Sequence, residues 1–166
     1  NWTNLPASTL DDDAQVSNRL LFDNGLLADS VGVVWGKHFD SSSTKEANHD
    51  HHSQLEPNTQ NERLFNGYDY TSTSETLSLD VTGLNAHYEI YDVYIYIDGD
   101  DGNSSENHSV RRITDGVTTY FLDDPDGNTF SGTFVESSST DPLSPGLGNY
   151  VVFRNVTNDT FSLRID

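Results

Sequence analysis

Two aspartate-rich turns supply the side chains in this sequence that are best suited to hold a metal ion. The turns span residues 98–103 and 123–128, and their candidate ligands are Asp98, Asp100, Asp101, Asn103, Asp124, Asp126 and Asn128. Carboxylate and amide oxygens on short glycine-bearing loops are the ligands that Ca²⁺ prefers. Neither turn has EF-hand spacing, because Gly102 stands where an oxygen ligand is needed and Thr129 replaces the turn glycine. A structural Ca²⁺ site and simply solvated acids therefore both remain open interpretations.

A second kind of chemistry is offered by the segment 88–98, in which tyrosines and aspartates alternate with apolar residues. Tyr94 and Tyr96 share one face of this segment with Asp92 and Asp98. An aromatic ring presents a flat apolar surface to the C–H side of a sugar, and carboxylates accept hydrogen bonds from its hydroxyls. The face is therefore a candidate carbohydrate site, unless a second layer of protein covers it. Binding residues concentrate in and beside loops, which adds Trp35, Tyr68 and Tyr70 as candidates.

Catalytic patterns are missing from the sequence. It has no Gly-x-Ser-x-Gly, no His-Glu-x-x-His, no phosphate-binding loop and no dinucleotide fingerprint, and without cysteine it has no thiol nucleophile. The histidines of one polar segment match the spacing of no standard metal site; they are His38, His49, His51 and His52. Whether that segment binds a transition metal stays open. We expect a protein that is not an enzyme.

These side chains must be positioned by β-strands, because apolar and polar residues alternate over much of the chain. Strands are predicted at 20–23, 31–37, 77–82, 88–98, 110–114, 117–122, 129–135, 149–156 and 160–165, with turns rich in Gly, Pro, Asn and Asp between them. No segment shows a sustained helical period. This pattern is typical of an all-β fold, an antiparallel β-sandwich of the jelly-roll kind.

One domain over residues 1–166 is expected, since a chain of this length buries roughly 70% of the surface that it exposes when unfolded. Its strand at 88–98 is predicted to be central, and a long polar loop is predicted at about 37–62. The predicted core contains Leu77, Leu79, Val81, Tyr91, Val93, Ile95, Ile97, Phe153, Phe161 and Leu163.

The charge balance excludes two classes of partner. The chain has 27 acidic residues against 8 Lys and Arg, which gives a formal net charge of -19. Phosphate backbones and anionic membranes are repelled by such a charge, so nucleic acid is not an expected partner. No apolar run approaches the roughly 20 residues that cross a bilayer, so membrane insertion is not expected either. The same balance suits a chain that works in high salt or holds divalent cations, and we expect a secreted, extracellular or cell-surface protein.

Several motifs, taken in their order along the chain, resemble a known class of proteins. They are Asn1-Trp2-Thr3-Asn4-Leu5, Leu64-Phe65-Asn66-Gly67-Tyr68, Tyr91-Asp92-Val93-Tyr94-Ile95-Tyr96 with Asp98-Gly99-Asp100, Gly148-Asn149-Tyr150-Val151-Val152-Phe153 and Phe161-Ser162-Leu163. The sequence resembles extracellular β-sandwich modules of large secreted proteins from marine bacteria of the planctomycete and verrucomicrobial kind. These are similar to carbohydrate-binding modules and galactose-binding-like sandwiches. The resemblance implies polysaccharide binding or adhesion rather than catalysis.

Adhesion through protein partners is the alternative function. Modules of the resembling class are expected to have a strand before the Asn-Trp motif and another after Leu163, and neither is present here. A fragment of a longer protein would explain this, and so would a sheet that another chain completes. A sheet that lacks its outer strands exposes an edge to which a strand of another chain can add. The segment 160–165 is patterned to be that edge or the donated strand, so self-association by an edge strand is a second expectation, against which stands a monomer whose loops cover the edge.

The first testable prediction concerns the proposed structural Ca²⁺. An ion that binds only the folded state stabilises it by mass action, by about 2.7 kcal/mol at a hundredfold excess over its Kd. We expect calorimetry at fixed ionic strength to show a higher melting temperature with Ca²⁺ than with EDTA. An unchanged transition would remove the Ca²⁺ site and leave only general screening of charge.

Overall fold

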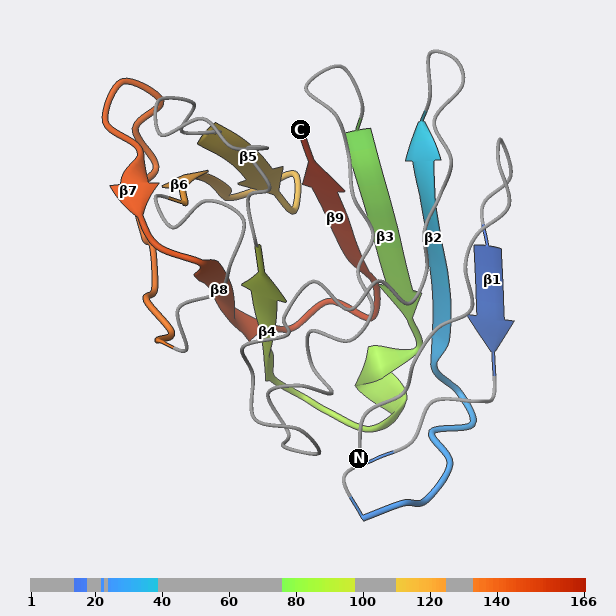
Figure 1. The fold of residues 1–166 in the computed structure, drawn as a ribbon. Helices are drawn as coiled ribbons and strands as arrows, with labels where there is room; N and C mark the ends of the chain where they lie inside the picture. The colour runs from blue at the N-terminus through green and yellow to red at the C-terminus, as the bar shows by residue number, and fades with distance from the viewer. Residues whose placement is uncertain (1–13, 18–21, 23, 39–75, 98–109, 125–132) are drawn as a thin grey trace.

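The computed structural model describes residues 14–17, 22, 24–38, 76–97, 110–124 and 133–166, which form two β-sheets (Figure 1). The prediction of an all-β fold is confirmed. Within these residues the elements are β1 (Ala14–Ser17), β2 (Gly32–His38), β3 (Thr76–Thr82), the 3-10 helix η1 (Leu84–Ala86), β4 (Tyr91–Tyr96), β5 (Val110–Thr114), β6 (Thr119–Asp123), β7 (Gly146–Leu147), β8 (Tyr150–Val156) and β9 (Phe161–Ile165).

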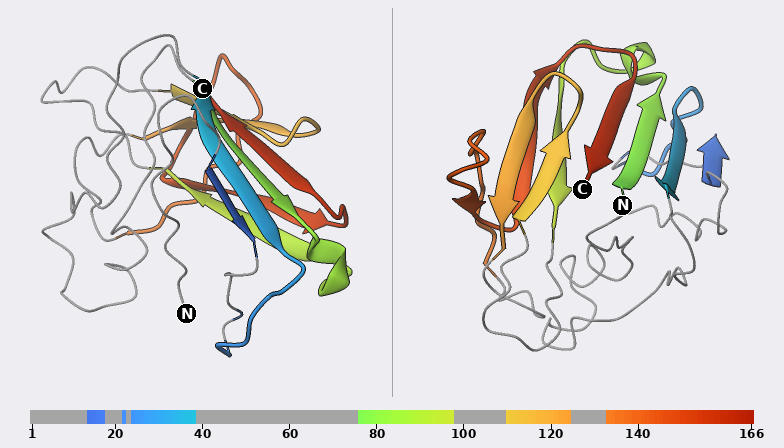
Figure 2. Two further views of the ribbon diagram at one scale, coloured as in Figure 1. Left: turned by 90° about the vertical axis from the view of Figure 1, so that its right-hand side faces the viewer. Right: turned by 90° about the horizontal axis from the view of Figure 1, so that it is seen from above.

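The strands divide unequally between the two sheets. The larger sheet has the order β1-β2-β3-β9-β5-β6-β7, and β4 pairs with β8 in the second. Figure 2 shows β4 and β8 as a separate layer, and this layer packs against residues of β3, β5, β6 and β9. β7 pairs with β6 in parallel, so the expectation of a wholly antiparallel fold is wrong at this edge. All the other strand pairs among the described residues are antiparallel.

The core fills the space between the layers because inward and outward side chains alternate along each strand. In β9, Phe161, Leu163 and Ile165 are buried while the residues between them are half-buried. The Phe153 ring of β8 meets the Phe161 ring edge-on, with centroids 5.3 Å apart. This contact joins the small sheet to the large one.

Most of the predicted core residues lie where the sequence placed them. Phe153, Phe161 and Leu163 are fully buried. The partly buried residues that pack against them are Leu77, Leu79, Tyr91, Val93, Ile95 and Ile97. Val81 packs instead with Val33 and Trp35 in a second cluster. The sequence did not single out Ile113, Leu122 and Val151, which have no exposed surface at all.

Two predictions about strand position are wrong. The strand at 88–98 is shorter, Tyr91–Tyr96, and it belongs to the two-stranded sheet instead of lying at the centre of a large one. The segment 160–165, patterned to be either an open edge or a donated strand, is β9, and it is no edge, because it pairs with β3 and β5 inside the large sheet. Alternation reports which faces a strand shows, but its neighbours depend on contacts distant in sequence, so period two cannot tell a central strand from an edge.

Three boundaries also differ from the prediction. The strand predicted at 31–37 is β2, which extends one residue further and so includes His38 from the start of the polar loop predicted at about 37–62; the rest of that loop lies outside the described residues. β1 was not predicted, and it pairs with β2. Of the predicted strand 129–135 only 133–135 is described, and it belongs to no named strand.

A tight connection carries the chain from the large sheet to the small one. Gly83 follows β3 with φ 78°, and a Cβ there would lie 1.9 Å from the carbonyl oxygen of Ser30. Only glycine fits this approach. The η1 turn is then anchored by Asp159, whose Oδ1 accepts a hydrogen bond from the Asn85 backbone N–H at 3.1 Å. These contacts set the point at which β4 starts.

The second prediction tests the core. Leu122 has no exposed surface, so Leu122→Ala should lower the free energy of unfolding by about 2–5 kcal/mol through lost burial and the cavity left behind. The matched control is Leu143→Ala, because Leu143 is 93% exposed and should change stability by less than about 0.5 kcal/mol. Urea unfolding measures both, and equal effects would contradict the described core.

Candidate functional site

The β4–β8 ladder sorts the side chains of the small sheet onto two faces. Residues directly opposite each other in a ladder point to the same face. Ile95 pairs with Val151 on the inner face, which meets the core. On the outer face Tyr94 pairs with Val152 and Tyr96 with Tyr150. The tyrosine face predicted from the sequence therefore exists, and β8 contributes a third tyrosine to it.

A third segment, residues 133–137, extends this face beside β8. The Asn149 side chain holds it at two points: Nδ2 donates to the Thr133 carbonyl at 2.8 Å, and Oδ1 accepts from the Val135 N–H at 2.9 Å. The Ser137 N–H then donates to the Tyr150 carbonyl at 2.8 Å. Asn149 is only 7% exposed, and its side-chain amide bonds to the protein backbone, so it is not available to a ligand. Its role is to place Phe134 and Glu136.

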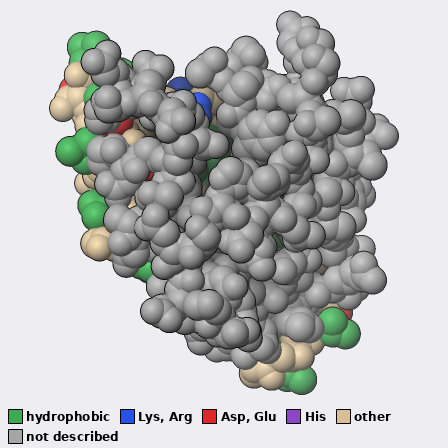
Figure 3. Space-filling view, in the orientation of Figure 1, with side chains coloured by type: hydrophobic (Ala, Val, Ile, Leu, Met, Phe, Trp, Pro, Cys, Tyr) green, Lys and Arg blue, Asp and Glu red, His purple; other side chains and the backbone are tan. Residues whose placement is uncertain are grey.

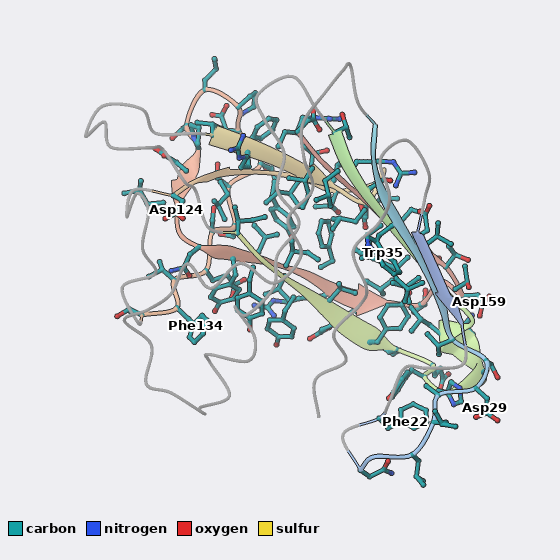
Figure 4. The ribbon with its side chains drawn as sticks, turned by 45° about the vertical axis from the view of Figure 1, so that its right-hand side comes forward. Phe22, Asp29, Trp35, Asp124, Phe134 and Asp159 are labelled. Atoms are coloured by element: carbon teal, nitrogen blue, oxygen red, sulfur yellow. The ribbon has the colours of Figure 1, made fainter. Side chains whose placement is uncertain are left out.

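Four aromatic rings come together on the outer face. We call Tyr94, Tyr96, Phe134 and Tyr150 the aromatic group. The Tyr150 centroid lies 6.4 Å from that of Tyr94 and 5.5 Å from that of Tyr96, with planes inclined at 29° and 34°, and the Phe134 ring meets Tyr96 edge-on at 5.4 Å. Tyr94 is 50% exposed and Phe134 is 37% exposed. Figure 4 shows Phe134 on the side of β4 and β8 that faces away from the large sheet.

An ion pair borders the aromatic group. Arg154 Nη2 donates to both carboxylate oxygens of Glu136, at 2.7 and 2.6 Å. Desolvation is the largest single influence on Arg154 and lowers its pKa, but the attraction and hydrogen bonds of Glu136, with a further contribution from Tyr94, outweigh it, so the pKa is raised. The guanidinium is thus charged. Both partners keep exposed side-chain surface, 47% for Arg154 and 33% for Glu136, so a ligand can reach them.

Asp92 lies near the start of β4, and its side chain stabilises the backbone there. Its Oδ1 accepts a hydrogen bond from the Asn155 N–H at 2.8 Å. The ladder register shifts between Tyr91 and Val93, and Asn155 has φ 56°, a left-handed conformation that asparagine tolerates better than most residues. Asp92 therefore supports an irregularity at the end of the face, and its side chain is exposed.

The remaining predicted site residues do not join the aromatic group. Trp35 is 7% exposed and packs with Val33, so the prediction that it binds a ligand is wrong: its ring has no face to offer. Asp124 is buried, at 3% exposed. The other candidates lie outside the described residues: Tyr68, Tyr70, Asp98, Asp100, Asp101, Asn103, Asp126 and Asn128. Across the part of the chain that is described, no three acidic or histidine side chains cluster as metal ligands would.

Sequence reasoning found Tyr94 and Tyr96 but missed the other four residues of the site. Tyr150 and Arg154 lie on the predicted strand 149–156, but the apolar run Val151-Val152-Phe153 between them hides the alternation, and all three of those residues are buried. Phe134 and Glu136 had no comparable signal, because they lie in an irregular segment that Asn149 holds in place.

The third prediction uses the burial of tyrosine hydroxyls. Burial is the main reason that the pKa of Tyr96 is raised above its usual value, and electrostatic interaction with Tyr150 and Tyr94 raises it further. Above about pH 10 the unfolded chain has lost its tyrosine protons while the folded chain still holds that of Tyr96, so stability must fall as the pH rises. We expect urea midpoints between pH 9 and 11 to fall less in Tyr96→Phe than in the wild type.

The exposed and non-ionisable Val117 provides the control, since Val117→Ala should follow the wild-type pH dependence. If Tyr96→Phe also follows the wild type, the described environment of the Tyr96 hydroxyl is incorrect.

No protein-family model matches the sequence, and no curated protein or solved structure matches it either. Among the described residues no helix is long and apolar enough to cross a membrane.

Proposed function

We propose that this protein is a non-catalytic carbohydrate-binding module, a jelly-roll-like β-sandwich that binds polysaccharide outside the cell or at its surface. The observation that carries the proposal is the aromatic group with the Arg154–Glu136 pair at its border. The sequence resemblance to extracellular β-sandwich modules points to the same function.

The aromatic group has the two properties that a sugar ring requires. Its rings supply apolar surface for the C–H bonds of a pyranose, and its tyrosine hydroxyls can donate and accept hydrogen bonds. The cluster is also held in place: Tyr150 contacts both other tyrosines, and Asn149 fixes the segment that bears Phe134. A site that is ordered before binding loses less conformational entropy when the ligand arrives.

The charges around the site favour a neutral polysaccharide. Glu136 neutralises Arg154, and exposed Asp92 adds a further negative charge on the same strand pair. The whole chain carries a formal charge of -19, which repels uronate and sulfate groups. Ca²⁺ remains a proposed structural ion, with its ligands among the acids of the two aspartate-rich turns.

An adhesive module that engages protein is the second candidate. It is favoured by apolar side chains in contact with solvent: Figure 3 shows hydrophobic side chains along the edge that carries β7, where Leu147 is 60% exposed. The argument from strand addition is weaker, because β9, the strand expected to add to another chain, already pairs with β3 and β5. We therefore rank it below carbohydrate binding.

The fourth prediction separates these functions. Tyr94→Ala should weaken binding to a neutral polysaccharide by roughly tenfold, since loss of one aromatic contact removes about 1.4 kcal/mol. Tyr88→Ala is the matched control, because Tyr88 is 44% exposed but lies at the opposite end of β4 from Tyr96, beside Phe22 and His87. Affinity electrophoresis in gels that contain glucan, galactan, mannan or xylan measures the effect.

Two results would contradict the proposal. Failure of the wild type to be retarded by any of these polymers removes carbohydrate binding, and equal retardation of wild type and Tyr94→Ala removes the aromatic group as its site.

A further inference from the structure

The Arg154–Glu136 pair places a hydrogen-bond donor directly beside an acceptor at the border of the aromatic group. Both bonds to Glu136 come from the same nitrogen, Nη2. A guanidinium has five N–H donors and no acceptor, while an ionised carboxylate accepts at about four lone-pair positions and donates nothing. Each partner therefore keeps hydrogen-bonding capacity beyond the bonds that it makes to the other.

Sugars carry a group that complements such a pair. Two hydroxyls on adjacent ring carbons can together accept from a guanidinium and donate to a carboxylate, and hydrogen bonds to charged partners are the stronger kind. The pair lies beside the aromatic group, because Tyr94 stands opposite Val152, two residues before Arg154 on β8, and Glu136 forms a bridge with Tyr150. A ring packed against Tyr94 would therefore bring its hydroxyl edge to Arg154 and Glu136.

We propose that the site selects neutral glycans whose internal residues carry a vicinal diol, and that Arg154 and Glu136 bind that diol. This inference rests on the proposed function and adds a specificity to it. Affinity and selectivity then come from different side chains. The aromatic group binds any pyranose, and the ion pair discriminates among linkages.

Linkage supplies a probe that leaves the sugar ring intact. A (1→4)-linked glucan or xylan has free adjacent hydroxyls at carbons 2 and 3 of each internal residue. A (1→3)-linked polymer of the same sugar has none, because its linkage occupies the carbon between the free hydroxyls. We expect soluble (1→4)-linked polymers to bind the wild type at least about tenfold more tightly than their (1→3)-linked counterparts.

Matched variants test which side chains are responsible. Glu136→Gln should abolish the preference for (1→4) linkage while weak binding to both polymers persists, and Arg154→Lys should reduce it, because an ammonium lacks the planar fork of a guanidinium. Asp166→Asn is the control. Asp166 forms a comparable exposed pair with Arg112, at 2.9 Å and with 47% and 41% of the side chains exposed, but on the large sheet.

The outcomes separate the inference from the proposed function. Loss of linkage preference in Glu136→Gln, with Asp166→Asn unchanged, supports the inference. Equal wild-type binding of both linkages overturns it and leaves carbohydrate binding intact. Equal weakening of both linkages by Glu136→Gln also overturns it, since a pair that merely holds residues 133–137 in place would act in that way. Absence of binding to every polymer overturns both.

Discussion

The packing of Phe153 between the two sheets is the contact on which the rest of the structure depends. Its ring meets Phe161 of the large sheet at 5.3 Å and Tyr120 at 5.1 Å, both edge-on. A ring buried in this way contributes several kcal/mol, most of it from removal of apolar surface from water. Because β8 is pleated, burial of Val151 and Phe153 directs Tyr150 and Arg154 outward. The core thus fixes the outer face without any residue dedicated to that purpose.

Polar contacts then determine how wide that face is. Asn149 is almost fully buried, and both ends of its amide are hydrogen-bonded to the backbone of residues 133–135. Gly148 allows this segment to approach, because a Cβ there would lie 2.7 Å from the Val135 carbonyl oxygen. A buried amide that lost these bonds would cost about 1–3 kcal/mol, so the arrangement is strongly specified. In this way an irregular segment brings Phe134 and Glu136 to the tyrosines of two regular strands.

Charge plays a different part in stability and in function. The ion pairs found among the described residues all have substantial exposed surface, and such pairs contribute only about 0–1 kcal/mol each; they are Arg112–Asp166, Arg154–Glu136 and Arg164–Asp80. They cannot offset the mutual repulsion of a chain with a formal charge of -19, so apolar burial and screening by ions must do so. At the aromatic group, however, one such pair supplies the directional hydrogen bonds that apolar rings lack.

The sequence by itself determined the all-β class, most of the core and two tyrosines of the site, because strand alternation is a local property that residue types reveal. Tyr94 and Tyr96 could be assigned to one face in this way. Only the tertiary structure decided that Tyr150 stands opposite Tyr96, that Trp35 is buried, and that β9 lies between two neighbours. Each of these depends on pairing between segments distant in the chain, and a register between strands is set by the packing of whole faces rather than by the residues of one strand.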